Sequence, residues 1–255
     1  MRLFNKTAAI TGAGGGIGRR AALSFAEEGA FVYILEIDEK SGQATERDIL
    51  KMGGRAAFIH TDVSDRAGVK NAFGRVEAER GALDILYNNA SVFWRNRDGI
   101  LGSLDLDDFE KILGINLKGT AYCCHYAIPL IKKAGGGSII NTGSSAGVIG
   151  IPGCDAYTAA KGAVVSLTRS LAVEYGPFNI RTNCICPAAI YTPMVAESNL
   201  SDPHFDEKRF LEQGTPLRRW GKPEEIASVA LFLATDGAAY LNGAIIVADG
   251  GITIM

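Results

Sequence analysis

The chain has 255 residues, of which 47% are hydrophobic and 21% are charged, and its formal net charge is −2 at pH 7. A chain of this length buries roughly three quarters of its unfolded surface, so it needs neither disulfides nor a metal in order to fold. The near-neutral charge and the lack of a basic block remove the electrostatic basis of nucleic-acid binding.

No apolar run in the sequence approaches the roughly 18 residues that cross a bilayer as a helix. The first residues, Met1–Lys6, lack the apolar core and the cleavage site of a signal peptide. We therefore expect a cytoplasmic protein with no membrane partner.

The cysteines are odd in number and lie in apolar surroundings, which argues against a disulfide framework. They are Cys123, Cys124, Cys154, Cys184 and Cys186. One adjacent pair and one C-x-C do not give the spacing of a zinc site, although a histidine follows the adjacent pair. We interpret the cysteines as small buried hydrophobic residues and predict no metal.

Short apolar runs alternate with helical patterns along the chain. The expected strands are Thr7–Thr11, Phe31–Glu36, Ala56–His60, Ile85–Asn88, Ser138–Thr142, Ile180–Ile185 and Ile245–Val247. The expected helices are Ile17–Glu28, Glu39–Met52, Arg66–Arg80, Asp107–Ala134, Tyr157–Tyr175 and Pro223–Ala234. Strands that are apolar on both faces suit a parallel sheet covered by helices on each side. The alternation predicts an α/β fold, a Rossmann-like doubly wound sheet of seven mainly parallel strands.

The boundaries of the elements suggest a single unit. Gly29 and Gly53 follow the first two expected helices as left-handed caps do, and Pro223 opens the last one. No linker or repeat divides the chain, so we expect residues 1–255 to form one dinucleotide-binding and catalytic domain. The longest irregular stretch is Ala188–Gly221, which we expect to be a lid or substrate-binding loop.

A glycine-rich turn, Thr11–Gly18, joins the first expected strand to the first expected helix. The usual dinucleotide spacing of glycines does not fit, and the spacing that does fit is Gly12, Gly16 and Gly18. Glycines let the backbone approach a pyrophosphate, and the start of a helix offers it free N–H groups. A merely flexible turn is the alternative, which the position between a strand and a helix disfavours.

Glu36 ends the second expected strand, eighteen residues after Gly18. A carboxylate at this place accepts hydrogen bonds from the adenosine ribose hydroxyls and repels a 2′-phosphate. Neither Ile37 nor Gly15 is basic, so the usual positions for binding that phosphate carry no positive charge. We therefore predict NAD rather than NADP, with Asp38 as the rival of Glu36 for the ribose contact.

Polar residues also end the third and fourth expected strands. Asp62 follows the third strand, where a carboxylate can accept a hydrogen bond from the adenine amino group. Asn88, Asn89 and Ala90 lie where the fourth strand ends, at the edge of the sheet that binds ligands in doubly wound folds. For Asn88, a structural role between strands is an equal alternative.

Tyr157 and Lys161 are one helical turn apart and therefore face the same way, and Ser144 precedes the tyrosine by thirteen residues. A free tyrosine, with a pKa near 10, is a poor base at neutral pH. The Lys161 ammonium and a nicotinamide cation both stabilise a phenolate, so we expect the pKa of Tyr157 to be lowered. Tyr157 then exchanges a proton with the substrate oxygen, to which Ser144 donates a hydrogen bond. We expect Asn116 to hold a water that passes protons from Lys161 to solvent.

A series of motifs follows one order along the chain. It runs Thr11-Gly12-x-x-x-Gly16-x-Gly18, Asp62, Asn88-Asn89-Ala90, Asn116, Ser144, Tyr157-x-x-x-Lys161, Asn183-x-x-x-Pro187 and Asp249-Gly250-Gly251. In this order the motifs resemble those of the short-chain dehydrogenase/reductase family over essentially the whole chain. Ser91 and Ala188 depart from the family pattern, because glycine is frequent at both positions.

The resemblance implies an oxidoreductase that interconverts a secondary alcohol and a ketone by hydride transfer. It implies the catalytic tetrad Asn116, Ser144, Tyr157 and Lys161, and a homotetramer built on the helices Asp107–Ala134 and Tyr157–Tyr175. The expected cofactor-binding residues are Gly12, Gly14, Gly15, Gly16, Ile17, Gly18, Glu36, Ile37, Asp62, Val63, Asn89, Ala90, Thr142, Tyr157, Lys161, Pro187, Ile190 and Thr192. The resemblance places Ile190 and Thr192 near the nicotinamide carboxamide.

Phe93, Trp94, Tyr191 and Met194 suggest an apolar substrate pocket. We expect a small-molecule substrate such as a cyclic secondary alcohol, a polyol, a cis-diol or a hydroxysteroid. A 3-oxoacyl-thioester reductase is the alternative, against which Glu36 and the lack of a basic docking patch weigh. A nucleotide sensor without turnover is a more distant alternative, because the chain keeps both the tyrosine and the lysine.

Overall fold

The computed structural model describes residues 1–200 and 204–255. Seven strands form one parallel sheet in the order β3-β2-β1-β4-β5-β6-β7. The strands are β1 (Thr7–Thr11), β2 (Phe31–Glu36), β3 (Arg55–His60), β4 (Ile85–Asn88), β5 (Gly137–Thr142), β6 (Ile180–Pro187) and β7 (Ile245–Ala248). The predicted doubly wound sheet is thereby confirmed, and all of its pairings are parallel.

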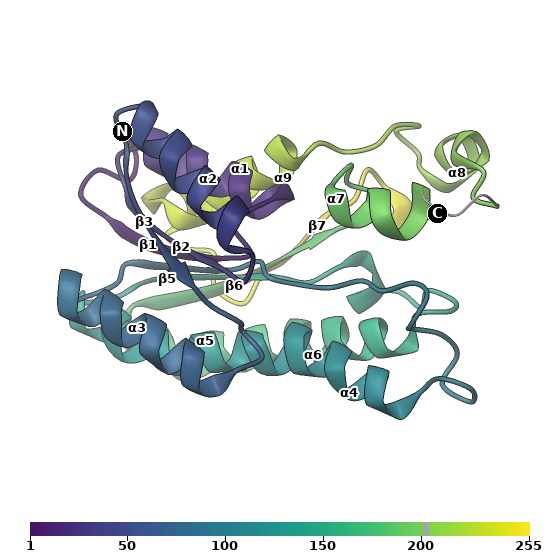
Figure 1. Ribbon diagram of the computed structural model, residues 1–255, viewed down its shortest axis with the longest axis horizontal. Coiled ribbons are helices and arrows are strands. Elements are labelled where there is room, and N and C mark those ends of the chain that lie inside the picture. The colour runs from purple at the N-terminus through teal and green to yellow at the C-terminus, as the bar shows by residue number, and fades with distance from the viewer. Residues whose placement is uncertain (201–203) are drawn as a thin grey trace.

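Helices cover both faces of the sheet (Figure 1). On one face lie α1 (Gly16–Glu27), α2 (Glu39–Lys51) and α9 (Pro223–Ala234). On the other face lie α3 (Arg66–Arg80), α5 (Gly119–Lys133) and α6 (Asp155–Tyr175). Short 3₁₀ turns are formed by Ser145–Gly147, Gly176–Phe178, Asp236–Ala238 and Ile252–Ile254. No helix in residues 1–200 and 204–255 is long and apolar enough to span a membrane.

The sheet separates two hydrophobic cores, which explains why its strands are apolar without alternation. Successive residues of a strand point to opposite faces, so Val32 and Ile34 join the core with α1 and α9. Tyr33 and Leu35 join the other core, with α3 and α5. Each such buried side chain contributes on the order of 1.5–3 kcal/mol to stability relative to an exposed one.

The five cysteines are buried and unpaired, as the sequence predicts. Cys123 and Cys124 belong to the core with α3 and α5, where burial raises the pKa of both thiols. The sulfur atoms of Cys184 and Cys186 lie 3.9 Å apart on β6. Among the described residues, no three His, Cys, Asp or Glu side chains gather as they would around a metal.

The helix expected over Asp107–Ala134 is interrupted. It consists of α4 (Leu106–Leu113), a π-helical turn (Gly114–Lys118) and α5. A π-helical turn inserts one extra residue and is often found at functional sites. Asn116 lies in this turn, so the extra residue changes the direction in which its side chain points.

The Ala188–Gly221 stretch, which we expected to be irregular, is helical in part of its described length. It contains α7 (Pro193–Val195), a π-helical turn (Ala196–Leu200) and α8 (Glu207–Gly214), and Pro203 lies outside the described residues. The Asp206 carboxylate caps α8 by accepting a hydrogen bond from the Arg209 N–H at 2.9 Å. Helices this short carry too few turns for a hydrophobic period to reveal them.

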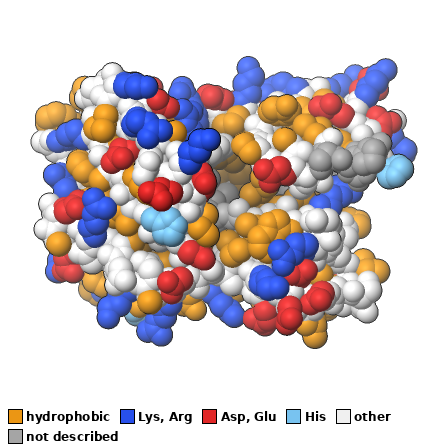
Figure 2. All heavy atoms as spheres, in the orientation of Figure 1, with side chains coloured by type: hydrophobic (Ala, Val, Ile, Leu, Met, Phe, Trp, Pro, Cys, Tyr) orange, Lys and Arg blue, Asp and Glu red, His pale blue; other side chains and the backbone are white. Residues whose placement is uncertain are grey.

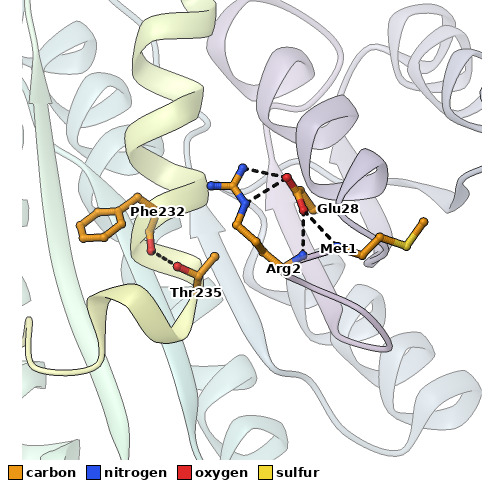
Figure 3. A network of polar contacts seen from close by, with 5 residues as sticks. All are labelled: Met1, Arg2, Glu28, Phe232 and Thr235. Atoms are coloured by element: carbon orange, nitrogen blue, oxygen red, sulfur yellow. Dashed lines mark hydrogen bonds and ion pairs between the residues drawn. The ribbon is translucent and has the colours of Figure 1, made fainter.

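The start of the chain is fastened to the end of α1 (Figure 3). Arg2 donates from its backbone N–H to Glu28 Oε2 at 2.7 Å, and from its guanidinium to Oε1 at 2.8 and 3.0 Å. These hydrogen bonds lower the pKa of Glu28. In the same view, Thr235 donates from its hydroxyl to the Phe232 carbonyl at 2.8 Å, at the end of α9.

A buried chain of hydrogen bonds joins the centre of the sheet to α6. Asn88 Nδ2 donates to Asn141 Oδ1 at 2.9 Å, and Asn141 Nδ2 donates to Thr168 Oγ1 at 2.9 Å. The Thr168 hydroxyl donates in turn to the Val164 carbonyl at 2.9 Å. Asn88 therefore has the structural role that the sequence left as one of two alternatives. This chain of bonds fixes α6 against β5.

We predict that Asn141→Ala lowers the free energy of unfolding by about 2–4 kcal/mol, because it removes the oxygen that accepts from the buried Asn88 amide and the N–H that donates to the Thr168 hydroxyl. Urea denaturation of the purified variant measures this loss. Val247→Ala, on a residue 40% exposed, is the control and should change the free energy by less than about 1 kcal/mol. An unchanged urea midpoint for Asn141→Ala would show that the network adds nothing to stability.

Candidate active site

A cavity of about 980 Å³ opens at the carboxyl ends of the strands. The strand order reverses between β1 and β4, and doubly wound folds bind ligands at this kind of switch point. Helices α7 and α8 stand at this end on the side of α1, and α4 stands on the side of α6 (Figure 1). Figure 2 shows a hollow near the middle of the face of the molecule that is in view, with hydrophobic side chains along its edge. The size suits a cofactor together with a small substrate.

The glycine turn packs too closely for a side chain at Gly12, Gly14 and Gly18. A Cβ atom on Gly18 would lie 2.1 Å from the Gly12 carbonyl oxygen, and one on Gly14 would lie 2.3 Å from Ser41 Oγ. Gly12 has φ +62°, and a Cβ there would lie 2.8 Å from Ala90 Cα. Gly15 gives α1 no side-chain cap, so the first N–H groups of this helix remain for an anion.

Glu36 is held in the cavity by backbone N–H groups. Its Oε2 atom accepts a hydrogen bond from Gly14 at 2.9 Å, and its Oε1 atom accepts from Ile37 at 2.9 Å and from Asp38 at 3.1 Å. The Asp38 carboxylate instead caps α2 by accepting from the Ser41 N–H at 2.8 Å. Of the two acids, Glu36 alone lines the cavity, so the geometry favours it over Asp38.

Asp62 and Asn89 also reach the cavity, and both have local partners. Asp62 Oδ1 accepts from the Ser64 N–H at 2.8 Å and from its hydroxyl at 2.7 Å. Asn89 Nδ2 donates to the carbonyls of Thr11 at 3.2 Å and Gly12 at 3.1 Å. The Asn89 side chain therefore supports the glycine turn.

Asn116 is fully buried in its π-helical turn. Its Oδ1 atom accepts hydrogen bonds from the Ser91 hydroxyl at 2.9 Å and the Val92 N–H at 2.8 Å. Its Nδ2 atom donates to the Val92 carbonyl at 3.0 Å. The side chain thus holds Ser91 and Val92 in place, which leaves one side-chain N–H for the water expected from the sequence.

Ser144, Tyr157 and Lys161 meet at the cavity. The buried Lys161 ammonium donates to the Thr142 carbonyl at 2.8 Å and lies 5.6 Å from the centre of the Tyr157 ring. Ser144 Oγ accepts from the Ala146 N–H at 3.2 Å. The ring of Phe93 lies 4.9 Å from that of Tyr157, centre to centre, and limits its movement.

Burial shifts the pKa of both titratable groups. It raises the pKa of Tyr157, and hydrogen bonding with Ser144 and Ser91 opposes this rise. It lowers the pKa of Lys161 to about 8. The lowered pKa that we expected for Tyr157 is therefore not found in the protein alone, because burial outweighs the hydrogen bonds. Two hydroxyl groups thus act on the tyrosine, and neither effect was predicted from the sequence.

Nearly all of the expected site residues line this one cavity. Those that do are Gly12, Gly15, Gly16, Ile17, Glu36, Ile37, Asp62, Val63, Asn89, Ala90, Thr142, Ser144, Tyr157, Lys161, Pro187, Ile190 and Thr192. Gly14, Gly18 and Asn116 do not line it and pack beside residues that do. Asn183, on β6, instead holds the loop that precedes β7, since its side chain donates to the Leu241 carbonyl and accepts from the Ala244 N–H.

The far part of the cavity has an aromatic wall. Phe205, Phe210 and Trp220 line it, with ring centres 5.2 Å apart for Phe210 and Trp220 and 5.4 Å apart for the two phenylalanines. Phe93 and Trp94, on another segment of the chain, line the same cavity. No period or motif in the sequence marks Phe205, Phe210 and Trp220, so they could not be predicted from it.

Arg95 and Arg97 closely follow Trp94 in the chain, and an arginine at this place can either bind an anion or face solvent. Arg97 forms an ion pair with Asp108, and its guanidinium carbon lies 4.4 Å from the centre of the Trp94 ring. The hydrogen bond to Asp108 lowers the pKa of that carboxyl. Arg97 is therefore occupied by residues of the protein, whereas the exposed Arg95 lines the cavity.

Comparison with known proteins places the chain in a family. A family model described as enoyl-(acyl carrier protein) reductase matches residues 12–253. The cyclohexanol dehydrogenase of Acinetobacter sp. (strain SE19) is 37% identical over 255 residues, which cover 98% of this chain and 95% of that protein. The 3-oxoacyl-(acyl-carrier-protein) reductase FabG of Thermotoga maritima is 35% identical over 254 residues and 100% of both chains.

Solved structures agree with these sequence relatives. The crystal structure of levodione reductase superposes with a TM-score of 0.94 at 33% identity and covers 99% of each chain. The chain belongs to the short-chain dehydrogenase/reductase family, and it is an oxidoreductase. Members of this family use a nicotinamide nucleotide, NAD or NADP, as cofactor.

The buried Lys161 ammonium should cost stability. A pKa of about 8, against an ordinary 10.5, corresponds to roughly 3 kcal/mol when the lysine is charged. Between these two values the folded state loses its proton first, so this cost disappears as the pH rises from 8 to 10.5. We predict that Lys161→Met is more stable than the natural protein at pH 7 by up to roughly 3 kcal/mol.

Denaturant unfolding of both proteins at pH 7 and near pH 10 measures this effect. The advantage of the variant should shrink at the higher pH. A variant that is less stable than the natural protein by the same amount at both pH values would mean that the hydrogen bond to the Thr142 carbonyl outweighs the cost of burial.

Proposed function

We propose that this protein is an NAD-dependent dehydrogenase that interconverts a secondary alcohol and a ketone, with Tyr157 as general acid and base. The observation that carries the proposal is that Ser144, Tyr157 and Lys161 share one cavity with the glycine turn and with Glu36. A catalytic group and a nucleotide-binding turn in one cavity are what hydride transfer requires.

The residues present fit a dinucleotide. The glycine turn has no room for side chains at Gly12, Gly14 and Gly18, and the start of α1 keeps N–H groups for a pyrophosphate. Glu36 would accept the ribose hydroxyls, and Lys161 would donate to the nicotinamide ribose. Thr142 also lines the cavity, where its hydroxyl can meet a polar group of the ligand. When bound, the nicotinamide ring supplies the hydride acceptor or donor.

The side chains handle the proton. In alcohol oxidation the Tyr157 phenolate takes the hydroxyl proton, and in ketone reduction the phenol returns a proton to the oxygen. Ser144 donates a hydrogen bond to the substrate oxygen as charge develops there. Lys161 carries a positive charge below its pKa of about 8 and stabilises the phenolate, which opposes the effect of burial on Tyr157.

For the substrate we propose a cyclic secondary alcohol or its ketone. The side chains of Phe93, Trp94, Phe205, Phe210 and Trp220, on two segments that line the cavity, are apolar and have flat faces for a ring. The name of the cyclohexanol dehydrogenase relative supports this substrate class. The relative named as a 3-oxoacyl reductase keeps a thioester substrate as the second candidate, which would use the same tetrad.

We also propose a cytoplasmic homotetramer in which each chain acts as one domain. Val173 on α6 is 80% exposed, and an apolar side chain on the outer side of this long helix suits a contact between subunits. The resemblance to the family supports the same assembly.

Initial rates with NAD and NADP over a panel of cyclic, linear, polyol and thioester alcohols test the reaction. We predict turnover of a cyclic alcohol with NAD and a loss of at least about 1,000-fold in Tyr157→Phe, because the variant cannot exchange the proton. The variant should still bind NADH, as tryptophan fluorescence would show. Undiminished turnover in Tyr157→Phe contradicts the assigned role.

Cofactor choice is tested at Glu36. We predict that Glu36→Gln raises the ratio of kcat/KM for NADP to that for NAD on the order of tenfold, since it removes the charge that repels a 2′-phosphate. Gln keeps an oxygen for the Gly14 N–H, so the turn should stay in place. Glu36→Ala should raise the ratio too and should bind both cofactors more weakly. A natural protein that prefers NADP would refute the argument.

A further inference from the structure

The helix that carries Tyr157 and Lys161 is capped by residues far away in the sequence. Asp98 Oδ1 accepts a hydrogen bond from the Ala156 N–H at 3.0 Å, and Asp98 Oδ2 accepts from the Tyr157 N–H at 2.9 Å. The Gly99 carbonyl accepts from the Asp155 N–H at 3.0 Å. Three successive N–H groups at the start of α6 are thus satisfied by the dipeptide Asp98-Gly99.

The contact also runs the other way. The Asp155 carboxylate accepts a hydrogen bond from the Leu101 N–H at 2.8 Å, so each segment caps the other. Cys154, which precedes α6, makes no side-chain cap. Other helices of this chain are capped by the aspartate directly before them, as Asp38 caps α2 and Asp65 caps α3.

The segment Ser91–Asp98 is attached to the catalytic groups at both of its ends. At its start, Ser91 and Val92 hold the Asn116 amide. At its end, Asp98 holds the backbone of Tyr157. Between them, Phe93 packs on the Tyr157 ring and, with its neighbour in the chain, lines the substrate side of the cavity.

We propose that Asp98 is a positioning residue for Tyr157 and that it couples the substrate wall of the segment Ser91–Asp98 to the phenol. Tyr157 lies in the first turn of α6, and the first turn of a helix frays when its N–H groups have no acceptor. A displacement of about 1 Å at a reacting group costs on the order of 100-fold in rate. The inference depends on the proposed function for its kinetic consequence only, since the cap itself does not require turnover.

The test compares Asp98→Ala and Asp98→Asn with Asp65→Ala, which removes the same kind of cap from α3, away from the cavity. Asp98→Ala should lower kcat roughly 10- to 100-fold, with little change in KM or in NADH binding. Asp98→Asn keeps one acceptor oxygen, so its kcat should lie between that of the natural protein and that of Asp98→Ala. Asp65→Ala should lose a comparable amount of thermal stability and keep its kcat.

Amide hydrogen exchange gives a readout that needs no substrate. In Asp98→Ala the amides of Ala156 and Tyr157 should exchange at least tenfold faster, while the amide of Thr168 in the middle of α6 keeps its rate. Unchanged exchange at Tyr157, or a kcat loss in Asp65→Ala equal to that in Asp98→Ala, overturns the proposal. If the natural protein turns over no substrate, the proposed function fails, and the exchange rates still decide whether Asp98 holds Tyr157.

Discussion

The site depends on how β1 and β4 are held together where they leave the sheet. The Thr11 hydroxyl accepts hydrogen bonds from the N–H groups of Asn89 and Ala90, each at 3.0 Å. The side-chain amide of Asn89 donates in turn to the Thr11 and Gly12 carbonyls. After this point the chain turns to α1 on one face and toward α4 on the other, and the crevice between the two connections becomes the cavity. The small residues Gly12, Gly18 and Ala90 allow the two ends to approach so closely.

The buried ionisable groups of the site lower the stability of this fold. Lys161 is a cation in the interior, held by a single carbonyl oxygen at 2.8 Å, and burial disfavours its charge. Burial likewise disfavours the phenolate of Tyr157. Because the two charges are opposite, the pair is less costly together than either charge alone. A structure optimised for stability alone would place apolar side chains at both positions.

Much of this fold could be read from the sequence because its strands are buried on both faces. An apolar run such as Phe31–Glu36, between a glycine cap and a helical pattern, is best explained as a buried strand. The bounds of the strands were therefore predicted within one or two residues. The meeting of Ser144, Tyr157 and Lys161 followed from one helical spacing and from the shared edge of a parallel sheet. Helical spacing is local, and the shared edge follows from the sheet topology, so both can be predicted from the positions of residues along the chain.

The remaining features depend on contacts between distant segments. The π-helical turn at Asn116 and the cap of α6 by Asp98 join residues that no periodicity connects. The pKa of Tyr157 depends on burial, which is a property of the packed cavity and not of a motif. Ser91 was visible as a departure from the family pattern, but its hydrogen bond to Asn116 needed coordinates to be seen.

The two walls of the cavity differ in what they are joined to. The wall that contains Phe93 belongs to a segment fixed to Asn116 and to the backbone of Tyr157, so any shift there moves the acid and base with it. The wall that contains Phe210 and Trp220 belongs to the stretch between β6 and α9, which makes no hydrogen bond to Tyr157 among the described residues. Under the proposed function, the fold separates a wall that places the catalytic groups from a wall that only shapes the substrate. We therefore expect a change of substrate to be accommodated at lower cost to the rate on the second wall, because the phenol keeps its place when that wall is rebuilt.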